Sequence, residues 1–293
     1  MNSFWIILTG SLVAATCGFL GCFLILRRMA MLGDAISHAI LPGIAIAFLL
    51  TGGRDSIAML VGAAVIGLLT VFLIQLFHQS GVKSDAAIGV TFTALFAIGV
   101  VLISLYGSHI DLDLDCVLYG EIAYVPWDTL VINGAEWGPR AVWGLGIIFI
   151  ISLLVVGLFF KQFKICTFDP AMAAAIGIPV ALFHYLLMGL VSMATVASFE
   201  SVGAILVVAM MVVPSATAYL LTDRLPVMLG LSMLIGVLCS ILGYSLATWL
   251  DSSIAGSMTV VAGLLFLISF LFSPRYGLVS KWQVRRQIKL ELE

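Results

Sequence analysis

The sequence predicts an all-α, polytopic membrane protein built as a bundle of about nine transmembrane helices. Of its 293 residues, 62% are hydrophobic and only 10% are charged, whereas a soluble domain carries about 25% charged residues. The apolar residues also form runs of roughly the 20 residues that cross a bilayer as a helix. The net charge of −2 offers no basic surface for nucleic acid, so the expected surroundings are membrane lipid.

Short polar or turn-forming clusters divide the apolar runs into spans. The weakest division is Ser198–Glu200; without it the chain would have eight spans instead of nine. We assign all spans to one transmembrane domain, residues 1–275, followed by a short basic cytoplasmic tail, residues 276–293. The expected spans are 4–26, 35–51, 57–77, 86–106, 141–161, 180–198, 201–221, 226–249 and 256–273.

The basic residues predict an N-terminus outside and a C-terminus in the cytoplasm. Cytoplasmic loops of membrane proteins are enriched in Lys and Arg. With nine spans in this orientation, eleven of the 13 basic residues lie inside, and only Arg54 and Arg140 lie outside. Residues 1–5 carry no positive charge ahead of the first apolar run, so this run is expected to remain as a helix rather than to be cleaved as a signal peptide. The five cysteines are scattered and predict no disulfide framework.

Asp34 and His38 lie one helical turn apart where the second apolar run begins. Residues at i and i+4 share one helix face, and a charged group at the centre of a membrane helix costs about 2.5–3.5 kcal/mol. Because carboxylate and imidazole are transition-metal donors, the pair is a candidate site for a divalent cation. In the alternative, Asp34 caps the helix and His38 is merely hydrogen-bonded. Pro42 and Gly43 are expected to weaken the helix and expose backbone to a cavity.

A second candidate is the acidic loop between the fourth and fifth spans. Acids at alternate positions line one side of an extended segment and would attract divalent cations or a basic partner; a solvated loop is the alternative. Glu200, expected at the N-terminus of the seventh span, is a further candidate ligand or helix cap. Trp127 and Trp137 are expected to lie on the membrane surface. The candidate ligands in the loop are His109, Asp111, Asp113 and Asp115.

Residues 161–179 predict a short cytoplasmic helix between two spans. Asp169 can cap it with Pro170 at the first helical position, and Gly177 can end it. A short capped helix at this place is typical of a docking element, although an ordinary structured loop is the alternative. The chain has no Gly-x-x-x-x-Gly-Lys motif for ATP and no nucleophile–base set, so we do not expect it to be an enzyme.

Four segments of the chain together carry a resemblance: Gly33–Gly43 (GDAISHAILPG), Leu112–Glu121 (LDLDCVLYGE), Thr167–Gly177 (TFDPAMAAAIG) and Ser201–Ala218 (SVGAILVVAMMVVPSATA). They resemble the membrane permease of bacterial ATP-binding-cassette importers for manganese, zinc or iron. The resemblance implies a permease pair, two cytoplasmic ATPase subunits, an extracytoplasmic metal-binding protein, and metal as transported cargo with no permanent cofactor. It also implies that Asp34 and His38 contact the metal. The acid Glu200 favours the manganese-type branch.

The resemblance also implies that the short cytoplasmic helix is the coupling helix that fits into the ATPase. This helix spans about Phe168–Gly177 and includes Asp169, Pro170 and Ala174. The alternative function is a secondary transporter or channel that moves divalent cations without an ATPase, using the same Asp34–His38 pair. Inverted repeats would support that alternative, and the sequence shows no convincing internal repeat.

Overall fold

A computed structural model describes residues 2–51, 56–106, 122–132, 135–273 and 277 of the chain. Within these residues, nine helical segments are long and apolar enough to cross a membrane. The all-α bundle and the number of spans predicted from the sequence are therefore confirmed. The tail that we assigned to residues 276–293 lies, apart from Gly277, outside the described residues.

The helices follow the expected spans closely, with most ends shifted by a few residues. One division was placed wrongly: the sixth span continues through Glu200 and ends at Val202, because Gly203, with φ of 79°, makes the turn. The helices are α1 (Asn2–Leu26), α2 (Met31–Ala39), α3 (Leu41–Thr51), α4 (Ser56–Gln79), α5 (Ser84–Tyr106), α7 (Arg140–Leu158), α8 (Phe160–Phe168), α9 (Pro170–Ala175), α10 (Val180–Val202), α11 (Ala204–Leu221), α12 (Leu225–Leu250) and α13 (Ile254–Phe272).

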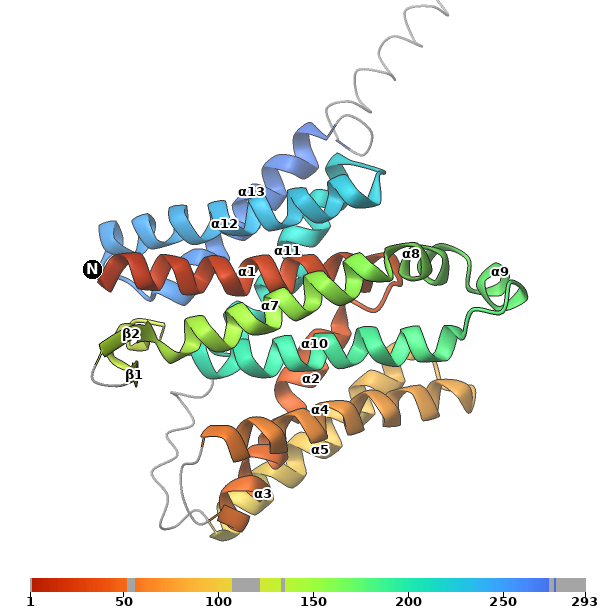
Figure 1. Ribbon diagram of the computed structural model, residues 1–293, viewed down its shortest axis with the longest axis horizontal. Coiled ribbons are helices and arrows are strands. Elements are labelled where there is room, and N and C mark those ends of the chain that lie inside the picture. Colours follow the sequence, from red (N-terminus) through yellow and green to blue (C-terminus); the bar gives the residue numbers. More distant parts are fainter. Residues whose placement is uncertain (1, 52–55, 107–121, 133–134, 274–276, 278–293) are drawn as a thin grey trace, which may run out of the picture.

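Helix α1 is the centre of the bundle and packs against α7, α10, α11 and α12 (Figure 1). Small residues allow these close contacts. A Cβ added at Gly21 would collide with the backbone carbonyl of Met211 on α11, and one at Gly236 on α12 would lie 2.8 Å from the Cβ of Ala14. Helices α4, α5, α7 and α13 instead expose many apolar side chains, as helices that face lipid should.

The second span is broken into α2 and α3 at Ile40, as Pro42 predicted. Proline cannot donate its backbone nitrogen to the helical ladder, so the chain restarts as α3 just before it. Glycines let α3 approach its neighbours closely. A Cβ at Gly99 of α5 would lie 2.8 Å from the ring of Pro42, and one at Gly62 of α4 would lie 2.6 Å from the carbonyl oxygen of Gly43.

A small hairpin, which the sequence analysis did not predict, joins α5 to α7. It contains a short helical turn, η2 (Val125–Trp127), and two antiparallel strands, β1 (Thr129–Ile132) and β2 (Ala135–Pro139). Trp127 and Trp137 are exposed, as expected for side chains at a membrane surface. The hairpin rests on the N-terminal end of α1, where Gly138 faces the ring of Trp5.

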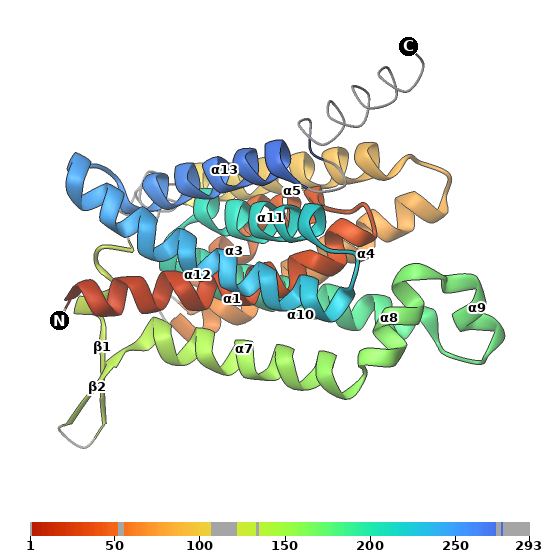
Figure 2. The same cartoon turned by 90° about the horizontal axis from the view of Figure 1, so that it is seen from above.

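The loops form two groups at opposite ends of the bundle. The N-terminus and the hairpin lie at one end, and α8 and α9 project from the other (Figures 1 and 2). This separation agrees with the alternation of loops on which the predicted topology rests. Which end faces the cytoplasm stays a prediction from the basic residues.

Candidate metal site and docking helix

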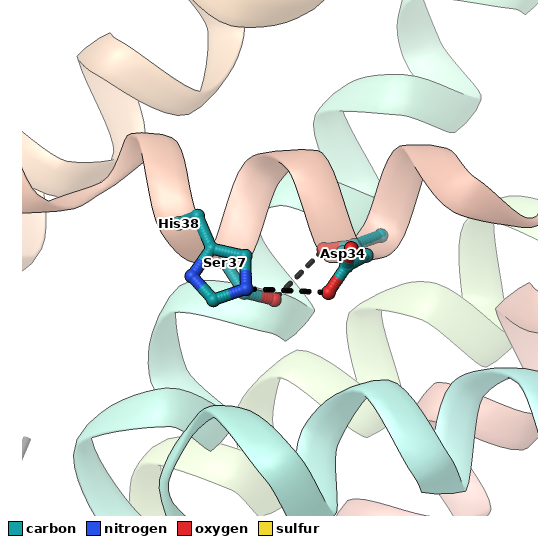
Figure 3. Close-up of polar contacts among 4 residues, drawn as sticks. Asp34, Ser37 and His38 are labelled. Carbon is teal, nitrogen blue, oxygen red and sulfur yellow. Dashed lines mark hydrogen bonds and ion pairs between the residues drawn. The ribbon is translucent and has the colours of Figure 1, made fainter. Parts of the chain in front are cut away.

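Asp34 and His38 meet on one face of α2, as their spacing predicted. The Nε2 atom of His38 lies 3.4 Å from Oδ1 of Asp34, and the two side chains point toward each other in Figure 3. Asp34 lies in the first turn of α2 but does not cap it, because the N-cap residue is Ala30 and no side chain caps that end. The capping part of the alternative is therefore wrong, whereas the place of Asp34 in the first turn and its contact with His38 are compatible with the rest of that alternative.

The opposite face of α2 fixes the pair in place. Leu32 and Ile36 are buried in the core, and a Cβ at Gly33 would collide with the Sδ atom of Met211 on α11. The hydroxyl of Ser37 donates to the carbonyl of Gly33 at 2.8 Å, so it is satisfied within the helix (Figure 3). Met211 is buried and serves here as a packing residue.

Two aromatic rings of α5 border the imidazole of His38. The ring centroids of Phe92 and Phe96 both lie 6.0 Å from that of His38. His38 and Asp34 nevertheless keep 32% and 35% of their side-chain surface exposed in the single chain. The pair thus combines a hard oxygen donor and an imidazole nitrogen on a face that this chain covers only in part.

The structure does not bring the other candidate ligands to this pair. His109, Asp111, Asp113 and Asp115 lie outside the described residues. Glu200 falls in the last turn of α10 rather than at the N-terminus of α11, so its expected capping role there is wrong. Among the described residues, no group of three or more His, Cys, Asp or Glu side chains could hold a metal ion.

The short helix between two spans forms as predicted, at Pro170–Ala175 (α9). A carboxylate oxygen of Asp169 accepts the backbone N–H of Met172 at 2.9 Å, Pro170 is at the start, and Gly177 has φ of 87° at the end. These caps satisfy the free backbone groups of so short a helix. The short capped helix is therefore present, and its docking role stays a prediction against the alternative of an ordinary structured loop.

Two features beside α9 were not predicted from the sequence. A separate helix, α8, precedes it, because the fifth span ends at Leu158 rather than at Lys161. Phe168, Met172 and Ile176, four residues apart, are each more than half exposed. Phe168 is the last residue of α8, and the non-helical Asp169 separates it from α9. The four-residue spacing of Met172 and Ile176 is the signal that could have revealed their shared face; we call the three side chains the exposed stripe.

Known proteins are similar to this chain over its whole helical part. The model of a family described as the ABC 3 transport family matches residues 2–273. The manganese transport system membrane protein MntD of Bacillus subtilis (strain 168) is 56% identical, over 94% of each chain. The zinc transport system membrane protein TroD of Treponema pallidum (strain Nichols) is 42% identical, over 98% of this chain and 78% of its own length.

A solved structure is similar as well. A chain of PsaBC from Streptococcus pneumoniae, solved in complex with Fab, is 37% identical and superposes with a TM-score of 0.77, covering 93% of this chain and 92% of that one. The family match over residues 2–273 includes the segments that carry Asp34, His38 and α9.

Proposed function

This chain belongs to the ABC 3 transport family, and we propose that it is the permease subunit of an importer that carries Mn²⁺ into the bacterial cytoplasm. The relative MntD is named for manganese transport and is more similar to this chain than TroD, which is named for zinc. Zinc and iron are the next candidates. Membership in an ATP-binding-cassette family favours this function over a secondary transporter or channel.

The observation that carries the proposal is the partly exposed Asp34–His38 pair in a membrane span. A charged or polar pair that faced lipid would be costly, so another protein surface must cover it. A second permease copy or paralogue would cover this face and bring its own acid and histidine to the same place. Two donors from each chain would supply the four or more ligands that a divalent transition metal takes.

Helix α9 is the proposed contact with the ATPase. No P-loop occurs in this chain, so the energy of ATP hydrolysis has to enter through a contact with a separate subunit. The exposed stripe of Phe168, Met172 and Ile176 is suited to a helix-in-groove interface. Its end of the bundle also carries the basic loops that predict the cytoplasmic side.

An extracytoplasmic metal-binding protein would deliver the ion at the other end, at the hairpin side. The acids at positions 111, 113 and 115 are the proposed attractants there. In this arrangement the ion passes from the hairpin side to Asp34 and His38, and the permease pair releases it toward α9.

Uptake by cells that depend on this chain tests the proposal. Asp34→Asn and His38→Gln keep the size of each side chain but remove a metal donor, and we expect each to lower ⁵⁴Mn uptake at least tenfold. Asp128→Asn, which removes an exposed acid paired with Arg140 at 3.7 Å, is the matched control and should transport normally.

The amount of each variant in the membrane must be measured alongside uptake. Uptake of Mn²⁺ by both variants at the wild-type rate would refute the role of the pair. Zinc or iron uptake that exceeds manganese uptake in the wild type would refute the choice of metal while leaving the site intact.

A further inference from the structure

A pocket of about 520 Å³, lined by both apolar and polar side chains, lies where α1, α4, α8 and α10 meet, next to the start of α9. It is separate from Asp34 and His38, which are not among its lining residues. Cationic and hydrogen-bonding side chains dominate its polar lining, and no acidic side chain occurs in that lining within the part of the chain that the structure describes. The polar side chains that matter here are Arg27, Arg28, Gln75, Gln79, His184 and Tyr185.

The pocket lies at the depth where membrane spans end. The first span ends at Leu26, the third at Gln79, and the sixth begins at Val180. All three residues line the pocket. Lipid headgroups occupy this depth in a bilayer, so the pocket faces the headgroup layer whichever side of the membrane this end of the bundle is on.

Arg27 lines the pocket and carries one donor that no group among the described residues satisfies. Its Nε donates to the hydroxyl of Thr167 at 3.3 Å, and its Nη1 lies 3.2 Å from Nδ1 of His184. Its Nη2 is buried and has no hydrogen-bond partner among the described residues. A buried donor on a charged group without a partner is costly, which points to a ligand that the protein itself does not supply.

The charge around this donor is positive. The two ion pairs found among the described residues, His38–Asp34 and Arg140–Asp128, do not involve Arg27 or Arg28. Burial lowers the pKa of Arg27, yet a guanidinium remains protonated in proteins. An oxyanion is the ligand that meets this charge, and the planar guanidinium fork matches the oxygens of a phosphate.

A row of exposed apolar side chains on α4, which we call the apolar track, extends from the pocket along the membrane-spanning part of the helix. Leu68 and Phe72 lie seven residues before Gln75 and Gln79 respectively, on the same face of α4, and both are about half exposed. Near Leu68 this face adjoins α10, where a Cβ at Gly189 would lie 3.7 Å from the side chain of Leu68. An acyl chain could lie along this track while its headgroup stays in the pocket.

We infer that this pocket binds the phosphate of an anionic phospholipid, with Nη2 of Arg27 as the central donor and Arg28, His184 and Gln79 around it. Basic pockets between transmembrane helices are suited to such headgroups. The bound lipid would connect the end of α1 to Thr167, three residues before α9 begins. The inference concerns lipid alone and does not depend on the metal or on the ATPase.

The test uses the full chain, purified and stripped of lipid in a neutral detergent. Phosphatidylglycerol, phosphatidylcholine with the same acyl chains, and inorganic phosphate are added separately. Native mass spectrometry measures the retained lipid, and thermal unfolding measures stabilisation. At a hundredfold excess over its Kd, phosphatidylglycerol should raise the unfolding midpoint by about 4 °C, and phosphatidylcholine should not.

Single-residue variants test whether the lipid binds in this pocket. Arg27→Gln should lower phosphatidylglycerol retention about tenfold, whereas Arg140→Gln at the opposite end should retain it fully. Because Arg27 is partly buried and its variant could fold poorly, Gln79 offers a second pair of changes at an exposed position. Gln79→Glu should weaken retention and Gln79→Lys should strengthen it.

Three results would overturn the inference. Equal retention of the two lipids by the wild type would show that no anionic headgroup is selected. Full stabilisation by inorganic phosphate, with nothing added by phosphatidylglycerol, would assign the pocket to free phosphate. Identical retention by Gln79→Glu and Gln79→Lys would place the bound lipid elsewhere.

Discussion

Shortening Met172 on α9 should weaken the association of this chain with its ATPase without harming the fold. The side chain of Met172 is 56% exposed in the single chain, so a partner that covers α9 would remove this part from water. Full burial of a methionine contributes about 1.5–3 kcal/mol, and the exposed half therefore about 1–1.5 kcal/mol. For Met172→Ala this corresponds to a Kd about five- to tenfold higher.

The helix itself should survive the change. Alanine is a better helix former than methionine, and the cap on α9 uses the backbone N–H of residue 172, which the variant keeps. The measurement is a titration of the purified permease with the ATPase subunit, together with metal-stimulated ATP hydrolysis. Tyr124→Ala, which shortens a side chain of equal exposure (57%) at the hairpin end, serves as the matched control.

An unchanged Kd for Met172→Ala would refute the assignment of the exposed stripe to the ATPase interface. An equal loss in Tyr124→Ala would show that the effect comes from general destabilisation rather than from docking.

Three further changes test neighbouring parts of the argument. Ala174→Arg puts a bulky charge on the exposed side of α9 and should abolish transport and pull-down of the ATPase while metal binding persists; a normal pull-down would contradict the docking role. Asp169→Ala removes the cap on Met172 and should cost about 0.5–2 kcal/mol of local helix stability, seen as faster amide exchange across α9. Gly33→Leu should lower the free energy of unfolding by about 1–3 kcal/mol through overpacking, and Met211→Ala should restore part of it; independent effects of the two changes would disprove the contact.

The number and places of the spans follow from the sequence because a bilayer leaves the backbone no alternative to helices. The same local logic located Asp169, Pro170 and Gly177 around α9, since caps depend on neighbouring residues. It failed at Glu200, where a polar side chain suggested a boundary but the positive φ of Gly203 set it. The hairpin at Thr129–Pro139 was not predicted from the sequence either, because two short strands give little periodic signal.

What only the tertiary structure decided is which side chains meet across helices. The i, i+4 spacing already joined Asp34 to His38, but contact with Phe92, Phe96 and Met211 depends on how α5 and α11 pack against α2. The Arg27 pocket could not be predicted from the sequence. Arg27 lies 140 residues from Thr167 and 157 residues from His184, and Thr167 and His184 belong to separate helices, α8 and α10. Sequence alone therefore determined the spans and the paired donors, and packing between distant spans decided the surroundings of each charge.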